Sequence, residues 1–130
     1  MLNVNEFKVI IAGSREFEDY TLLKSQCDYY LQNKLNDPYC TVVIVSGHAR
    51  GADSLGERYA REMGLGCDIY PADWKTLGKR AGYVRNELMA KVSNAAIIFL
   101  SAYGENKGSQ HMIDIAKRDG LNVKVVQEEP

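Results

Sequence analysis

The sequence predicts a three-layer α/β fold of the Rossmann-like type, built around a mainly parallel five-stranded sheet. Short apolar segments alternate with segments of helical periodicity through nearly the whole chain. Several of these apolar segments are continuously hydrophobic, which is typical of strands that helices cover on both faces. The chain has 130 residues, of which 45% are hydrophobic and 25% charged. This composition suits a single domain over residues 1–130, with its core from about 8 to 126.

The first half of the chain contains two strand–helix pairs. The first strand is rich in β-branched residues and stops at Gly13, and the second leads into a loop bounded by Gly47 and Gly51. Apolar residues at helical spacing follow each strand, and the helices end at an Asn-Asp-Pro break and at Gly64. We therefore expect strands at residues 8–12 and 41–46, and helices at about 19–35 and 52–63.

The second half continues the alternation. A short strand at residues 67–70 is closed by Pro71, and a continuously apolar strand is expected at 95–100. Between them, helical spacing predicts a helix over about 77–92, with a buried apolar stripe formed by Leu77, Ala81, Val84, Leu88 and Val92. A helix over 109–119 is expected to stop at Gly120, and a last strand is expected at 122–126.

Charge and cysteine content narrow the possible partners and compartment. The net charge is −1, so the chain as a whole lacks the basic character that nonspecific nucleic-acid binding requires. The three cysteines show no paired spacing, which disfavours a disulfide framework or a zinc site and suits a reducing cytoplasm. The longest apolar runs are far short of the roughly 20 residues that cross a bilayer, so no membrane association is expected.

The loop after the second strand is the strongest candidate for a ligand site. Ligands of open parallel sheets bind beyond the carboxyl ends of the strands, and this loop is expected there. Its small residues permit close approach of the backbone to a ligand, and it opens onto a helix whose first N–H groups attract anions. We therefore expect it to bind a phosphate. Its ligand-binding candidates are Ser46, Gly47, His48, Arg50, Gly51, Ala52 and Asp53.

Three further loops are expected at the same edge of the sheet. Gly13, Ser14 and Arg15 follow the first strand, and Asp73 and Trp74 follow the third. Trp74 is either a residue that stacks on a base or a core residue. After the fourth strand, Gly108 and Ser109 precede a helix.

Two acidic or hydroxyl residues in these loops have two interpretations each. Asp53 is either an N-cap or first-turn acid of its helix, or an acceptor for ribose hydroxyl groups. Ser109 is either an N-cap alone, or part of a second phosphate-binding helix start with Gly108.

A helical cluster adds Arg85, Asn86 and Met89, which lie near one another at helical spacing. Arg85 is a candidate phosphate ligand, and Asn86 is a candidate for a base or sugar. The alternative is a solvated polar face with Met89 in the core, and spacing alone favours that alternative.

Four of these stretches together resemble a known family. They are Gly13-Ser14-Arg15, the loop at 46–53, Pro71-Ala72-Asp73-Trp74, and the helix with Arg85, Asn86 and Met89. The combination resembles the YspA-type branch of the SLOG superfamily and spans roughly residues 8–126. The resemblance implies a Rossmann-like fold that binds nucleotides, nucleotide sugars or NAD-derived molecules in bacteria and their phages. Relatives include the LOG phosphoribohydrolases, the molybdenum-cofactor carrier proteins and the DNA-processing protein DprA.

The chain departs from the LOG enzymes where their catalytic glutamate stands. Gly108 and Ser109 keep the expected phosphate turn, but Met112 occupies the position of that glutamate. A methionine side chain cannot act as an acid or base. Catalytic residues are therefore unassigned, and Arg85 and Glu87 are the best candidates if the protein is an enzyme.

Three hypotheses follow for the function. The first is a sensor or sequestering protein for a nucleotide or an NAD-derived nucleotide sugar such as ADP-ribose. The second is a hydrolase that cleaves an N-glycosidic or phosphoribosyl bond, and the third is a DprA-like DNA-processing module. No metal is required, although Mg²⁺ is compatible with a pyrophosphate ligand. Related folds dimerise beside the site, so a homodimer is expected.

Overall fold

The computed structural model describes residues 5–130 and contains one five-stranded sheet in the order β3-β2-β1-β4-β5. Every neighbouring pair of strands is parallel. This arrangement confirms the predicted Rossmann-like α/β class. The strands are β1 (Asn5–Gly13), β2 (Cys40–Ser46), β3 (Gly66–Ile69), β4 (Ala95–Leu100) and β5 (Asn122–Gln127).

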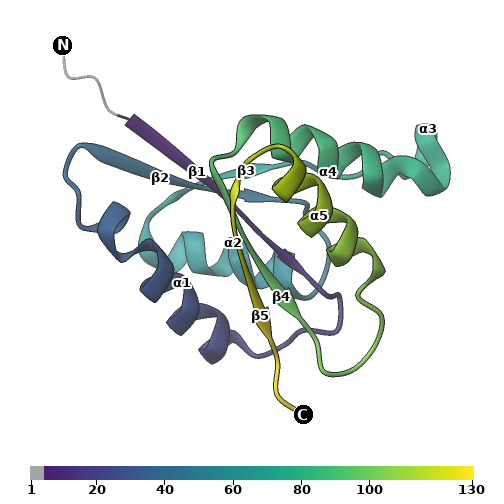
Figure 1. Cartoon of the computed structure of the whole chain (residues 1–130), viewed down its shortest axis with the longest axis horizontal. Helices are drawn as coiled ribbons and strands as arrows, with labels where there is room; N and C mark the ends of the chain where they lie inside the picture. Colours follow the sequence, from purple (N-terminus) through teal and green to yellow (C-terminus); the bar gives the residue numbers. More distant parts are fainter. Residues whose placement is uncertain (1–4) are drawn as a thin grey trace.

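Helices cover both faces of the sheet. Figure 1 shows α1 (Tyr20–Leu35) at the lower left and α5 (Lys107–Arg118) at the upper right, on opposite sides of the strands. With α2 (Ala52–Met63), α1 packs on the face that carries Ile11 and Ile44. With α4 (Ala81–Val92), α5 packs on the face that carries Ile10 and Ile98. Alternate residues of one strand therefore enter two different cores, which explains why the central strands are continuously apolar.

The chain reverses its direction of winding at β1. From β1 it proceeds through β2 to β3 on one side, and it then returns to place β4 on the other side of β1. Gly13, the last residue of β1, pairs with Phe99 of β4. The carboxyl ends of β1 and β4 therefore form the topological switch point, where open α/β sheets place their ligands.

The helix predicted over 77–92 is α4 over its last twelve residues and ends at Val92 as predicted. Its predicted start is instead the last residue of α3 (Trp74–Leu77), followed by a 3₁₀ helix (η1, Gly78–Arg80). Gly78 adopts φ +60, which a continuing right-handed helix cannot contain. The last predicted helix also begins two residues earlier than expected, at Lys107.

The predicted buried stripe of this helix is correct at Ala81, which is 1% exposed, and wrong at Val84, Leu88 and Val92. Val84, Leu88 and Val92 are 36%, 49% and 41% exposed, whereas Met89 and Ala90 are buried. The core-facing side of α4 contributes Met89 and Ala90 to the same cluster as residues of α5 and the sheet. Helical spacing identifies an apolar face but does not reveal whether a neighbouring element covers it.

Candidate functional site

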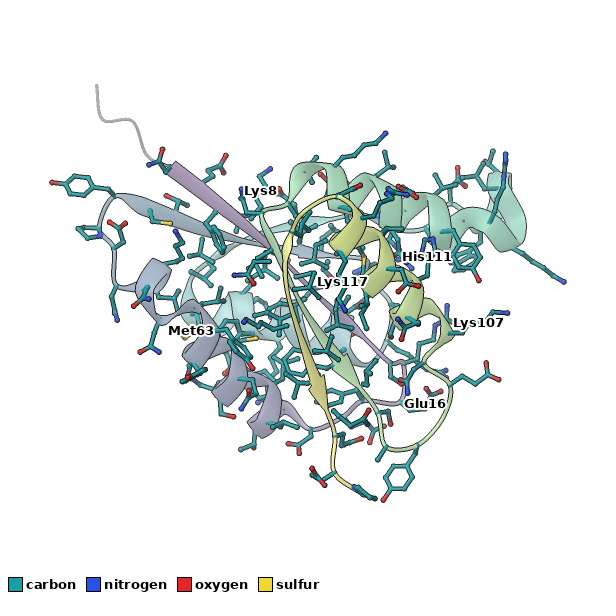
Figure 2. All side chains as sticks on the ribbon, viewed as in Figure 1. Lys8, Glu16, Met63, Lys107, His111 and Lys117 are labelled. Carbon is teal, nitrogen blue, oxygen red and sulfur yellow. The ribbon has the colours of Figure 1, made fainter. Side chains whose placement is uncertain are left out.

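A cavity of about 500 Å³ lies at the switch point. Loops from both halves of the sheet meet there, together with α4 and the start of α5. In Figure 2, Glu16 marks the segment after β1 and Lys107 marks the N-terminal end of α5, and both residues line the cavity. Ten of the ligand-binding candidates predicted from the sequence line this cavity: Gly13, Ser14, Arg15, Arg50, Asp53, Trp74, Arg85, Asn86, Gly108 and Ser109.

Arg85 connects α4 to the loop after β2. Its Nη1 donates to the carbonyl oxygen of Gly47 across 2.5 Å, and its Nε donates to Oδ1 of Asn86 across 3.0 Å. The Nδ2 of Asn86 lies 3.1 Å from Nδ1 of His111 on α5. Figure 2 labels His111 on α5, and its ring packs edge-on against Tyr83. These contacts fix the Arg85 guanidinium at the cavity wall. The alternative in which Arg85 and Asn86 belong to a solvated polar face of the helix is therefore wrong.

Asp53 is a buried carboxylate on the cavity wall. It lies in the first turn of α2 and is 5% exposed, while the N-cap is Gly51. Its Oδ2 accepts a hydrogen bond of 3.2 Å from the N–H of Ala49. Burial raises the pKa of Asp53 to about 6, although the Ala49 hydrogen bond and the charge of Arg85 oppose this rise. The side chain is therefore a titratable group on the cavity wall; of the two structural roles considered for it, Asp53 is the first-turn acid of α2 and not its N-cap.

Much of the loop before α2 is already hydrogen bonded within the protein. The N–H of His48 donates to Oγ of Ser46, and the N–H of Ala52 donates to the carbonyl of Ser14. Together with the Ala49 N–H, three donors of the predicted phosphate loop have protein acceptors. The Asp53 carboxylate also places negative charge at the helix start, where an anion would bind.

The start of α5 is more open to a ligand. Lys107, Gly108 and Ser109 all line the cavity from its first turn. The N-cap is Asn106, whose side chain makes no capping hydrogen bond, so the prediction of Ser109 as N-cap is wrong. Ser109 is 6% exposed, and its hydroxyl has no hydrogen-bond partner among residues 5–130. This helix start thus offers unpaired N–H groups, a hydroxyl and an ammonium group to one anion.

Arg15 stands beside Trp74. Its guanidinium carbon lies 5.9 Å from the centre of the indole ring, and no acidic side chain of the described chain forms an ion pair with it. Arg50 is paired only across 3.5 Å, with Glu16, and is largely exposed. Both arginines therefore have donors available to a ligand.

Several glycine and serine residues support this edge by close packing. A Cβ on Gly13 would lie 2.0 Å from the Phe99 carbonyl oxygen, and a Cβ on Gly51 would lie 2.3 Å from that of Ser14. Ser14 is buried, and its Oγ donates to Glu16 across 3.1 Å. Both glycines are required by close approach of the backbone.

Other predicted residues lie outside this cavity. Asp73 is the N-cap of α3 and accepts from the N–H of Thr76 across 3.1 Å. Ser46 and Ala52 are fully buried. Glu87 is 2.6 Å from Arg118 in an ion pair and does not line this cavity.

Met89, Met112 and Ala12 line the cavity and supply an apolar floor. Met89 belongs to the predicted cluster with Arg85, whereas no motif indicated Ala12. Glu57 was not predicted either: its Oε2 accepts from Ser46 Oγ across 2.7 Å and lies 3.0 Å from Nδ1 of His48. No motif marks Glu57, since its partners are 9 and 11 residues away.

Metal-binding clusters and membrane-spanning helices are both absent from the part of the chain that the structure describes. Residues 5–130 contain no group of three or more histidine, cysteine, aspartate or glutamate side chains able to hold a metal ion. Within the same residues, no helix is both long enough and apolar enough to cross a bilayer.

The sheet order and the cavity at its switch point define a Rossmann-like protein with a ligand-sized site. The family model described as YspA, cpYpsA-related SLOG family matches residues 7–76, which contain the first three loops of the site. The chain is also 32% identical over 121 residues to the Gene 61 protein of Mycobacterium phage D29, covering 89% of this chain and 93% of that protein. No solved structure matches. The chain belongs to the YspA, cpYpsA-related SLOG family.

Proposed function

We propose that this protein binds a nucleotide or an NAD-derived nucleotide sugar of the ADP-ribose type, as a sensor or sequestering protein. One observation carries the proposal: the open start of α5 and the buried carboxylate of Asp53 line the same cavity. The first suits a phosphate and the second suits the hydroxyl groups of a ribose. A volume of about 500 Å³ is within the usual range for small-molecule sites.

The phosphate is assigned to the first turn of α5. Ser109 contributes a hydroxyl without a protein partner, Lys107 contributes charge, and the helix dipole favours an anion at this end. This assignment moves the main phosphate contact away from the loop before α2. In that loop, Asp53 already occupies the helix start.

The sugar and base are assigned to the remaining lining. The ionised carboxylate of Asp53 accepts hydrogen bonds from ribose hydroxyls, and the side chain of Asn86 lies on the same cavity. Trp74 and Tyr83 offer aromatic faces for a base, and both line the cavity while remaining partly exposed. Met89 and Met112 supply the apolar floor.

A hydrolase is the second candidate, and Asp53 is the observation that favours it. A carboxyl group with a pKa of about 6 suits general acid–base catalysis near neutral pH. Met112, however, is 1% exposed at the cavity and supplies no acid or base where the LOG enzymes have a glutamate. The binding function is therefore preferred. Cleavage of the N-glycosidic or phosphoribosyl bond of a bound nucleotide would establish the hydrolase instead.

The proposal includes a homodimer formed through α4. The exposed apolar stripe of α4 consists of Val84, Leu88 and Val92, and it is symmetric in sequence about Leu88. A two-fold axis at Leu88 would place Val84 of one copy against Val92 of the other, as an isologous contact requires. Large apolar side chains at 36–49% exposure gain from such burial.

The experiment compares Ser109→Ala and Lys107→Gln with the wild type in thermal-shift titrations with AMP and ADP-ribose. Each variant is expected to weaken binding by roughly threefold to tenfold, since each loses about one hydrogen bond or ion pair to the phosphate. Lys117→Gln, an exposed lysine near the other end of α5, is the matched control. Equal loss in the control variant would contradict the phosphate assignment.

A further inference from the structure

A second cavity of about 430 Å³ adjoins the first and has a different charge. Its lining contains three arginines, Arg15, Arg50 and Arg85, together with His48, and no acidic residue lines it. The first cavity, in contrast, is lined by Asp53, Glu16 and Glu105 as well as by basic residues. The lining of the second cavity is thus basic or uncharged, and of its basic residues Arg15 has no carboxylate partner among residues 5–130, whereas Arg50 pairs with Glu16 and His48 with Glu57.

The two cavities share a wall. Arg15, Ala49, Arg50, Trp74 and Arg85 line both of them. Of these residues, Arg15 has no carboxylate partner in the described chain and lies against the Trp74 ring at 5.9 Å. Arg85 uses Nε and Nη1 for protein acceptors, which leaves Nη2 without an acceptor among residues 5–130. These groups can therefore donate into either cavity.

His48 is held in place on the second cavity. Its φ is +63, an uncommon conformation for a residue other than glycine. Its N–H donates to Ser46 Oγ at 3.2 Å, and its Nδ1 lies 3.0 Å from Oε2 of Glu57. Nε2 is then the ring nitrogen that remains for a ligand, and it is a donor whenever the ring is protonated. A carboxylate-oriented histidine in a rare backbone conformation is typical of a functional position.

Asp53 lies at the border between the cavities. A Cβ built on Gly47 would be 2.5 Å from Arg85 Nη1 and 2.9 Å from Oδ2 of Asp53, so both side chains meet at this residue of the second cavity. The N–H that Asp53 accepts belongs to Ala49, which lines both cavities. A ribose bound at Asp53 would therefore have its hydroxyl groups next to Arg15, Arg50 and Arg85, the arginines that line both cavities.

We propose that the second cavity binds a second phosphoryl group of the ligand, one carried on the hydroxyl side of the ribose whose 5′-phosphate binds at α5. The ligand class is then a nucleoside 3′,5′-bisphosphate or a dinucleotide linked through that position. This inference rests on the proposed function, because it places the first phosphate and the ribose as described above. The cluster of Arg15, Arg50, Arg85 and His48 would hold the second phosphate.

The test measures calorimetric affinities of the wild type for AMP, ADP and adenosine 3′,5′-bisphosphate. The bisphosphate is expected to bind at least tenfold more tightly than AMP, and ADP is expected to gain less than threefold. A gain with ADP but not with the bisphosphate would place the extra phosphate on the 5′ side and overturn the inference. AMP binding without any gain for the bisphosphate would overturn this inference and leave the proposed function standing. If none of the three nucleotides binds, this inference and the proposed function both fail.

A matched pair of variants assigns the gain to the second cavity. Ala72 lines the second cavity but not the first. Ala72→Glu adds a negative charge there, and Ala72→Gln adds a side chain of nearly equal size without charge. The glutamate variant is expected to bind the bisphosphate at least tenfold more weakly than the glutamine variant. For AMP, the affinities of the two variants are expected to differ by less than threefold. Equal differences for the two ligands, with both variants folded by thermal melting, would overturn the assignment.

Discussion

The Nη1 atom of Arg85 donates to the carbonyl oxygen of Gly47 across 2.5 Å, although the two residues are 38 positions apart in the chain. This bond joins α4, on one face of the sheet, to the loop that leads into α2 on the other face. The carboxylate of Asp53 stands against the same glycine. The two halves of the fold are therefore connected at the cavity of the switch point.

Arg85→Lys is expected to weaken nucleotide binding at least tenfold. Lysine has no planar fork, so it cannot donate to Gly47 and Asn86 while also reaching a ligand. Calorimetric titration with ADP-ribose measures the effect, and Arg61→Lys, an exposed arginine of α2 outside both cavities, is the control. Wild-type affinity in Arg85→Lys would show that the guanidinium does not contribute to the site.

Gly47→Ala is expected to weaken binding by a similar factor because its Cβ would displace neighbouring side chains of the site. The added Cβ would lie 2.5 Å from Arg85 Nη1 and 2.9 Å from Oδ2 of Asp53, so at least one of these groups must move. Gly66→Ala is the matched control, since its Cβ has no neighbour closer than 3.6 Å. Binding that is equal in the two alanine variants would contradict the close packing around Gly47.

Asp53→Asn is expected to stabilise the fold at pH 7 while weakening ligand binding. Burial raises the pKa of Asp53 to about 6, so the folded state retains a proton that the unfolded state releases above its ordinary pKa near 4. The free energy of unfolding therefore falls as pH rises through that interval, by up to about 3 kcal/mol from this group alone. Asparagine does not ionise and keeps an oxygen for the Ala49 N–H.

Chemical denaturation at pH 4 and pH 7 measures this effect. The stability of the variant relative to the wild type is expected to increase between the two pH values. A relative stability that decreases or stays constant would show that the buried carboxyl is not the origin of the pH dependence. Nucleotide affinity of the wild type is expected to fall below pH 6, where the Asp53 carboxylate, proposed to accept hydrogen bonds from ribose hydroxyls, becomes protonated.

Leu88→Lys is expected to convert a dimer into a monomer. The side chain is 49% exposed in the single chain, so the substitution costs the fold about 0.5 kcal/mol or less. Light scattering measures the molecular mass, and Val125→Lys, at 42% exposure on β5, is the control. A wild-type mass of one chain, or a dimer that persists in Leu88→Lys, would contradict the contact through α4.

The sheet could be predicted from the sequence because its signals are local. The strand at residues 95–100 has the predicted bounds, since a continuous apolar run between polar loops has one common interpretation. The end of α2 at Gly64 was also predicted, and Gly64 adopts the left-handed conformation at the C-cap. The positive φ of Gly78, in contrast, divides a segment whose apolar spacing suggested one helix.

The candidate site was less predictable because its decisive contacts are long-range. Loop motifs indicated the switch-point edge, but nothing in the order of residues shows that Arg85 bonds to Gly47. The burial of Asp53, and with it the raised pKa, depends on packing between segments distant in sequence. The exposed stripe of α4 was misjudged for the same reason: periodicity identifies a face, and only the fold decides what covers it.

A calorimetric titration of the wild-type protein with ADP-ribose, followed by mass spectrometry of the mixture after long incubation, tests the proposed binding function most directly. Saturable binding at one ligand per chain is expected, and the ligand should be recovered unchanged. At a ligand concentration of a hundredfold the Kd, the free energy of unfolding should also rise by about 2.7 kcal/mol. Release of a base or a ribose phosphate would instead establish the hydrolase. The absence of binding to ADP-ribose, AMP and NAD, with binding to single-stranded DNA, would contradict the nucleotide site altogether.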